Sequence, residues 1–229
     1  MINWFFVHLH PCYKFLYFIY KRLTDAKYIS WIKSYLKKGM TVVDIGANIG
    51  FSTILLSNLV GNKGKVYSFE PDKTNFHFLK RNTKNRKNVS LQNLAVGNKD
   101  GSTNLYLSKN FNVNHRCYDA GENNIVKKVK CVTLDKFFGT KKRIDLIKID
   151  IEGFDYYATL GARNLIKKQK KIAIFGELWP YGLRKAGTSV QEYLALLKGM
   201  NLKVIYEIPK NFGQLEKLKN YYTNFIAFK

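Results

Sequence analysis

The chain has 229 residues, of which 46% are hydrophobic and 15% aromatic, enough to build one large α/β domain around a buried core. This composition excludes a disordered, collagen-like or disulfide-scaffold protein. The three cysteines form no Cys-x-x-Cys pair, so we expect a reducing, cytoplasmic compartment and no structural zinc site.

The charge balance is strongly basic, with 39 Lys and Arg against 16 Asp and Glu and a formal net charge of +23. Lysine supplies 32 of the 39 cations. Because nucleic-acid grooves rely on the bidentate geometry of arginine, this bias argues against a dedicated nucleic-acid site. Two interpretations remain open: a solvated lysine-rich surface, or attraction to anionic lipids or an anionic substrate.

Residues 1–36 hold 11 of the 34 aromatic side chains. A transmembrane helix needs about 20 largely apolar residues, whereas Pro11 and several polar residues interrupt this segment. No signal-peptide pattern precedes it either. We therefore expect an N-terminal helical segment, either a pair of helices packed on the domain and covering the active site, or a lysine-flanked segment in a membrane interface that gives peripheral membrane association.

Strands and helices alternate over residues 37–229, which predicts one domain with a doubly wound, mostly parallel sheet and helices on both faces. The expected strands are 41–45, 65–70, 89–96, 103–107, 145–151, 171–178, 203–208 and 223–228. The expected helices are 51–60, 74–85, 154–167 and 189–200. Apart from strand 103–107 and a turn at 98–101, residues 97–130 look polar and irregular.

A glycine-rich turn follows the first strand, where open α/β sheets bind their ligands. Glycine lets the backbone approach a ligand closely. The turn has neither the Gly-x-Gly-x-x-Gly spacing of dinucleotide folds nor the P-loop pattern, so it predicts a ligand without phosphate but with a cationic amino acid end. The candidate cofactor-binding residues here are Asp44, Gly46, Ala47, Asn48 and Gly50.

Glu70 ends the second strand, 24 residues after the first glycine. A carboxylate at this position can accept hydrogen bonds from both hydroxyls of a ribose, and Pro71 and Asp72 adjoin it. Asn93 and Ala95 end the third predicted strand and would flank an adenine, although Asn93 also fits an ordinary strand end. A glycine turn paired with a ribose acid predicts S-adenosylmethionine as the cofactor.

Four segments of the chain together resemble the FkbM-type S-adenosylmethionine-dependent methyltransferases. These segments are 42–51, 66–71, 144–153 and 177–180. The resemblance covers roughly residues 37–208 and implies the Rossmann-like class I methyltransferase sheet, seven strands with the last one antiparallel. It also implies O-methylation of a hydroxyl on a sugar, glycan, glycolipid or related small molecule. Trp179 stands where this family more often has histidine.

Methyl transfer to an alcohol requires a positioned nucleophile and a base that takes its proton. Asp150 and Glu152 are spaced i, i+2, so in an extended segment both would point to one side, and Glu177 ends the following strand. We expect these three carboxylates to be catalytic. The alternatives are that they bind a divalent cation, or that Asp150 orients the cofactor while Glu152 caps the next helix.

Three further residues are candidates for substrate contacts. Lys148 shares a strand face with Asp150, so we expect it to be buried in an ion pair with that or a nearby acid, with substrate contact as the alternative. His115 could act as a base and Arg116 as an anion contact, although loop residues often do neither.

Two other functions compete with a small-molecule methyltransferase. A nucleic-acid (RNA) methyltransferase would use the basic surface, but enzymes that methylate base amino groups usually carry an Asn/Asp-Pro-Pro-aromatic signature at the fourth strand end, and residues 150–153 read Asp-Ile-Glu-Gly. A non-catalytic membrane module is disfavoured by the intact acids at the strand ends. We therefore expect a small-molecule or glycan acceptor.

Overall fold

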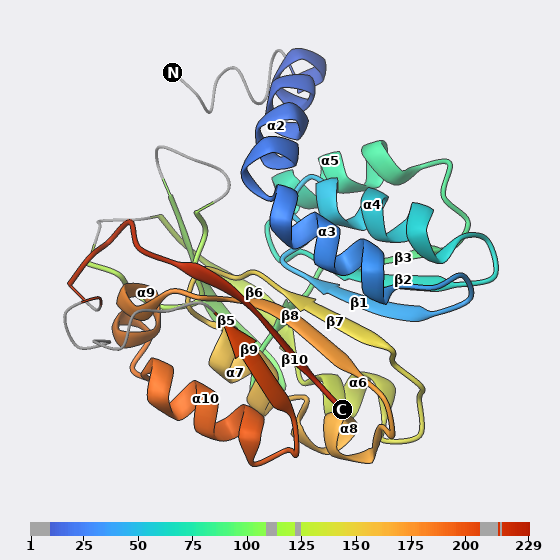
Figure 1. Cartoon of the computed structure of the whole chain (residues 1–229). Coiled ribbons are helices and arrows are strands. Elements are labelled where there is room, and N and C mark those ends of the chain that lie inside the picture. The colour runs from blue at the N-terminus through green and yellow to red at the C-terminus, as the bar shows by residue number, and fades with distance from the viewer. Residues whose placement is uncertain (1–9, 109–113, 122–124, 207–214, 216) are drawn as a thin grey trace.

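The computed structural model of the chain describes residues 10–108, 114–121, 125–206, 215 and 217–229. A seven-stranded sheet forms its centre (Figure 1). Across the sheet the strands are β3 (Val89–Gln92), β2 (Lys65–Phe69), β1 (Thr41–Ile45), β7 (Leu146–Ile149), β8 (Ala173–Leu178), β10 (Thr223–Phe228) and β9 (Lys203–Tyr206). The first five are parallel, and β10 is antiparallel to both neighbours. The predicted mostly parallel sheet is confirmed.

Helices cover both faces of this sheet because its central strands are apolar on both sides. On β1, Val42 packs toward one layer of helices and Val43 toward the other. The first layer contains α3 (Ala26–Tyr35), α4 (Phe51–Val60) and α5 (Lys73–Thr83). The second contains α6 (Leu134–Phe138), α7 (Asp155–Leu160), α8 (Arg163–Lys168) and α10 (Val190–Lys198). A short helix, α9 (Pro180–Lys185), follows β8.

A second sheet contains β4 (Ala95–Val96), β6 (Ile125–Val132) and β5 (Gly101–Leu107), in the order β4-β6-β5. The prediction that residues 97–130 are largely irregular was wrong for β6. This strand is lysine-rich and mostly exposed, so it lacks the apolar pattern that reveals a buried strand.

Two predicted elements are divided in the structure. The strand 89–96 breaks after Gln92, because the Asn93 side chain donates hydrogen bonds to the carbonyls of Glu70 and Pro71. The helix 154–167 divides at Gly161, where a Cβ atom would lie 1.9 Å from the carbonyl oxygen of Gly97. Both divisions depend on contacts with distant parts of the chain. The last two residues of the predicted strand 203–208 lie outside the described residues.

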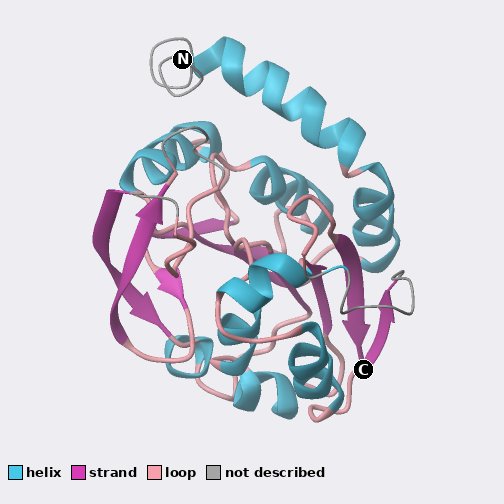
Figure 2. Cartoon of the chain, turned by 90° about the vertical axis from the view of Figure 1, so that its left-hand side faces the viewer, coloured by secondary structure: helices cyan, strands magenta, loops and turns pink. Residues whose placement is uncertain are grey.

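The N-terminal segment forms α2 (His10–Thr24), which follows the N-terminus at the top of Figure 2, and α3. The buried Ile32 of α3 joins the core beside Phe175. The ring of Phe18 on α2 meets the ring of Phe51 edge-on, with centroids 5.2 Å apart. The packed helix pair is therefore confirmed for residues 10–35. Within the part of the chain that the structure describes, no helix has the length and apolar character needed to cross a membrane.

Candidate active site

The site begins with the register of three neighbouring strands. Asp44 on β1 pairs with Lys148 on β7, and Lys148 pairs with Phe175 on β8. Glu177 lies two residues beyond Phe175, so its side chain points to the same face as Phe175. Polar side chains therefore gather on the face that α3 and α4 cover, at the carboxyl ends of the strands.

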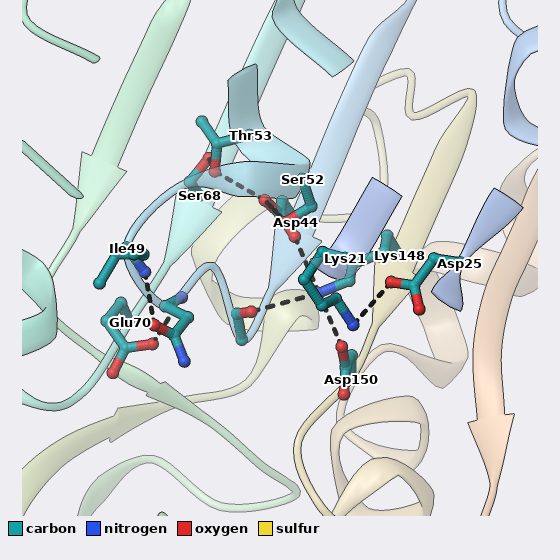
Figure 3. A network of polar contacts seen from close by, with 12 residues as sticks. Lys21, Asp25, Asp44, Ile49, Ser52, Thr53, Ser68, Glu70, Lys148 and Asp150 are labelled. Carbon is teal, nitrogen blue, oxygen red and sulfur yellow. Dashed lines mark hydrogen bonds and ion pairs between the residues drawn. The ribbon is translucent and has the colours of Figure 1, made fainter. Parts of the chain in front are cut away.

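Lys148 is the centre of this group, and its side chain is only 4% exposed. Its Nζ lies 3.3 Å from Oδ1 of Asp44 and 3.6 Å from Oδ2 of Asp150, and it donates to the carbonyl of Gly46 (Figure 3). Burial alone would lower the pKa of Lys148, but the two carboxylates outweigh it and the pKa rises. The expected buried ion pair is confirmed, and a direct contact of Lys148 with the substrate stays a prediction.

Asp44 is fully buried beneath the glycine turn. Its Oδ2 accepts hydrogen bonds from the hydroxyls of Ser52 and Thr53, in the first turn of α4. The carboxylate thus fixes the start of α4 to β1 and to Lys148. Because its contacts are with these protein groups, Asp44 would act on the cofactor by positioning its neighbours.

A cavity of about 490 Å³ lies beside this network, a size typical of small-molecule sites. The glycine turn lines it through Gly46, Ala47 and Asn48, and β7 and β8 line it through their carboxyl ends. The opposite wall comes from α2 and α3. The residues that these helices contribute are Tyr17, Tyr20, Lys21, Tyr28, Ile29 and Ile32, and Asp25 lines the cavity from the junction between them.

The three predicted catalytic carboxylates, Asp150, Glu152 and Glu177, all line the cavity. The extended segment expected for the first two is wrong: β7 ends at Ile149, and Glu152 has φ +57°. The cavity nevertheless receives both side chains because this turn follows directly on β7. Glu152 does not cap α7, because the N-cap position is Phe154 and makes no side-chain hydrogen bond.

The environment separates the pKa values of these acids. Burial would raise the pKa of Asp150, but the charges of Lys148 and Lys21 outweigh burial and lower it. Burial and the charge of Asp150 raise the pKa of Glu152 to about 8. Burial and the neighbouring acids raise the pKa of Glu177 well above its ordinary value. Asp150 is therefore held ionised, while the pKa values of Glu152 and Glu177 are both raised.

Asp155 is a fourth acid beside this group. It is buried, and burial together with the charge of Asp150 raises its pKa to about 7. Its Oδ2 accepts from the backbone N–H of Gly153, whereas its Oδ1 has no hydrogen-bond partner among the described residues. Among those residues, no three His, Cys, Asp or Glu side chains are grouped so as to hold a metal ion.

Lys21 on α2 was not predicted as a site residue. Its Nζ lies 2.6 Å from Oδ2 of Asp25 at the cavity wall. Burial would lower the pKa of Lys21, but Asp150 and Asp25 outweigh it and raise the pKa. Nothing in the spacing along the chain connects residue 21 with residue 150. The only signal was the aromatic segment expected to cover the site.

The loop after β5 brings one of its two predicted residues to the cavity. Arg116 forms an isolated bridge with Tyr106, and its guanidinium lies 5.1 Å from the ring centroid of Trp179. Both Arg116 and Trp179 line the cavity. His115 does not: its Nδ1 accepts from the backbone N–H of Ser108, and burial lowers its pKa.

Glycine is required twice in the turn after β1. Gly46 has φ +80°, and a Cβ there would lie 2.0 Å from the carbonyl oxygen of Asp150. Gly50 has φ +100° and faces Leu79 of α5 rather than the cavity. The first glycine therefore lets the turn lie directly against the end of β7, and the second admits α5.

Glu70 ties the glycine turn to the end of β2. It is 5% exposed, and its oxygens accept from the backbone N–H groups of Asn48 and Asp72. Burial, partly offset by these bonds, raises its pKa to about 7.

The other residues predicted near the ribose and adenine hold local structure. The Oδ1 of Asp72 accepts from the N–H groups of Thr74 and Asn75, so Asp72 caps α5. Asn93 bonds the carbonyls of Glu70 and Pro71. Ala95 is buried in β4 of the second sheet. Contacts of these residues with the cofactor stay predictions.

The sheet order, with the antiparallel β10 between β8 and β9, defines a class I methyltransferase fold. The chain matches the methyltransferase FkbM domain over residues 44–203. It therefore belongs to the FkbM methyltransferase family, as the resemblance implied, and is an S-adenosylmethionine-dependent methyltransferase. The accessible backbone of residues 46–48 and the buried carboxylate of Glu70 fit this cofactor.

Three solved structures illustrate the likeness in fold. A putative rRNA-methylase from Clostridium thermocellum is 16% identical with a TM-score of 0.55, covering 89% of this chain and 93% of that one. A putative methyltransferase from Streptococcus mutans, in complex with SAH, is 14% identical with a TM-score of 0.54, covering 89% and 96%. Precorrin-6y C5,15-methyltransferase from Geobacter metallireducens is 16% identical with a TM-score of 0.51, covering 89% and 87%. None of the curated proteins matches the chain.

Proposed function

We propose that this enzyme methylates a hydroxyl group of a sugar, glycan, glycolipid or related small molecule. The observation that carries the proposal is the group of carboxyls in one cavity, where Glu152 and Glu177 have raised pKa values and Asp150 a lowered one. In active sites, titratable groups whose surroundings push their pKa values apart typically act as the acid and the base of the reaction.

The bound cofactor supplies an electrophilic methyl group on a sulfonium. The backbone of residues 46–48 and Glu70 would hold it at the ends of β1 and β2. Glu177 or Glu152 accepts the hydroxyl proton. The pKa of Glu152, raised to about 8, suits this role because a base with a pKa near the working pH is the more effective one. Asp150 stays ionised and fixes Lys148 and Lys21 in the cavity wall.

The rest of the cavity suits an acceptor rich in hydroxyls. Amide side chains, which donate and accept hydrogen bonds, line it at Asn114, Asn220 and Asn224. Arg116 and the ring of Trp179 complete this wall. A few polar groups around an apolar surface are typical of small-molecule sites.

RNA is the second candidate acceptor, because the chain carries +23 and a solved structure of similar fold is a putative rRNA-methylase. The cavity argues against it, since the ionised Asp150 would face a polyanion. RNA binding would also weaken steeply as salt increases.

The test is a direct acceptor screen. The purified enzyme is incubated with S-adenosylmethionine that carries a labelled methyl group. Sugars, glycolipids and a structured RNA are added as acceptors in separate reactions. We expect label in a hydroxyl-bearing small molecule, recovered as a methyl ether by mass spectrometry. Label that enters only RNA would contradict the proposal and establish the second candidate.

A further inference from the structure

Helix α2 has two different apolar faces. Its inner face packs Tyr13, Tyr17 and Phe18 against the glycine turn and α5. Its outer face carries Phe15 and Leu16, each 66% exposed, and Leu23, 73% exposed. Together with Ile19, these residues follow the i, i+3 and i, i+4 spacings that place side chains on one side of a helix.

Exposed apolar side chains are concentrated on α2. Of the ten exposed large hydrophobic side chains among the described residues, five belong to α2. The patch continues to the mouth of the cavity, because Tyr20 of α2 and the exposed Tyr222 both line it. An exposed apolar patch of this kind marks an interaction surface.

The charges around the patch indicate the partner. Residues 10–36 contain five cations and a single acid, Asp25, which Lys21 already pairs. Arg22 on α2 and Lys27 and Lys33 on α3 are exposed. A second copy of a chain that carries +23 would be repelled. An anionic partner with an apolar interior complements both the charge and the apolar side chains.

We propose that the outer face of α2 inserts into the headgroup region of an anionic lipid bilayer, with α2 lying parallel to the membrane surface. At 15 residues the helix is about 22 Å long, too short to span the bilayer. Apolar residues bordered by cations are typical of such interfacial helices. This orientation places the mouth of the cavity beside the membrane, whatever the acceptor is.

The full chain is tested by vesicle co-sedimentation, with neutral phosphatidylcholine and with mixtures containing phosphatidylglycerol. We expect binding to the anionic vesicles only, decreasing with salt. The variant Phe15→Ser/Leu16→Ser/Leu23→Ser should bind at least about tenfold more weakly, because it removes three insertable side chains. The matched control Ile125→Ser/Val126→Ser/Ile205→Ser removes three exposed apolar side chains elsewhere and should bind like the native chain.

Circular dichroism and light scattering accompany both variants. If the native chain does not bind anionic vesicles, or if both triple variants bind them equally, the proposal is overturned. A native dimer that becomes monomeric only in the α2 variant, without lipid binding, would assign the patch to a second copy and overturn the membrane proposal as well.

Discussion

Acids stand at two places along the same edge of the sheet, with different surroundings. At the end of β2, Glu70 and Asp72 are buried and accept hydrogen bonds from backbone N–H groups. At the ends of β7 and β8, Asp150 and Glu177 face a cavity, and the charges of Lys148 on β7 and Lys21 on α2 act on Asp150. Backbone N–H groups engage the first pair, whereas the second pair faces the cavity.

The difference teaches that position at a strand end does not by itself assign a role. Asp72 was grouped with the cofactor residues from its place in the sequence, yet it caps α5. Glu177 had the same kind of support and lies in the cavity. The two differ in their surroundings: the Oδ1 of Asp72 accepts from two backbone N–H groups at the start of α5, whereas Glu177 lines the cavity.

The largest effect is expected at the cavity acids. Glu177→Gln should lower kcat by about 10² to 10⁴-fold, because the amide cannot take a proton, and should leave KM for the cofactor nearly unchanged. The matched control is Glu192→Gln at the start of α10, where glutamine preserves the cap. Both rates are measured with the acceptor found in the screen. Equal rates in the two variants would show that Glu177 does not act as the catalytic base.

Lys148→Met tests the buried ion pair behind the cavity. It leaves Asp44 buried without its cation, so we expect a loss of about 3–5 kcal/mol in the free energy of unfolding. The control is Arg143→Met, which removes the exposed partner of Asp145 and should cost at most about 1 kcal/mol. Urea unfolding measures both, and similar losses would mean that burial does not distinguish the two pairs.

Glu70→Ala tests the other end of the comparison. Loss of hydrogen bonds to a charged group, about 1.5–3 kcal/mol each, should raise the Kd for S-adenosylmethionine by roughly 10²-fold in calorimetric titration. Asp72→Asn keeps the cap of α5 and should change the Kd less than about threefold. An undiminished affinity in the Glu70 variant would refute the ribose assignment.

The smallest effect concerns Lys21, whose charge lowers the pKa values of Asp150, Glu152 and Glu177. Its removal raises those pKa values. Because the base must be deprotonated, the rise of kcat with pH should move to higher pH in Lys21→Met, by less than about one unit. Lys33→Met, an exposed change on α3, should leave the profile in place. If the pH profile is unchanged in both variants, the charge of Lys21 on α2 does not influence the catalytic base.

Much of the fold follows from local pattern. The bounds of β1, α4 and β10 were predicted exactly from alternating apolar residues and the glycine turn, because strands and helices have different periods of side-chain direction. The convergence of Asp150 and Glu177 was also predicted, since the carboxyl ends of adjacent parallel strands share one edge. The exposed lysine-rich β6 gave no such signal.

The sequence by itself determined the family, the cofactor turn and the acids at the strand ends, because these features are encoded within short segments. Only the tertiary structure decided that Lys21 reaches the cavity, that Asn93 ends β3, and that α2 keeps an apolar face outside. Each of these depends on contacts between segments far apart in the chain, and periodicity along one segment carries no information about what packs against it.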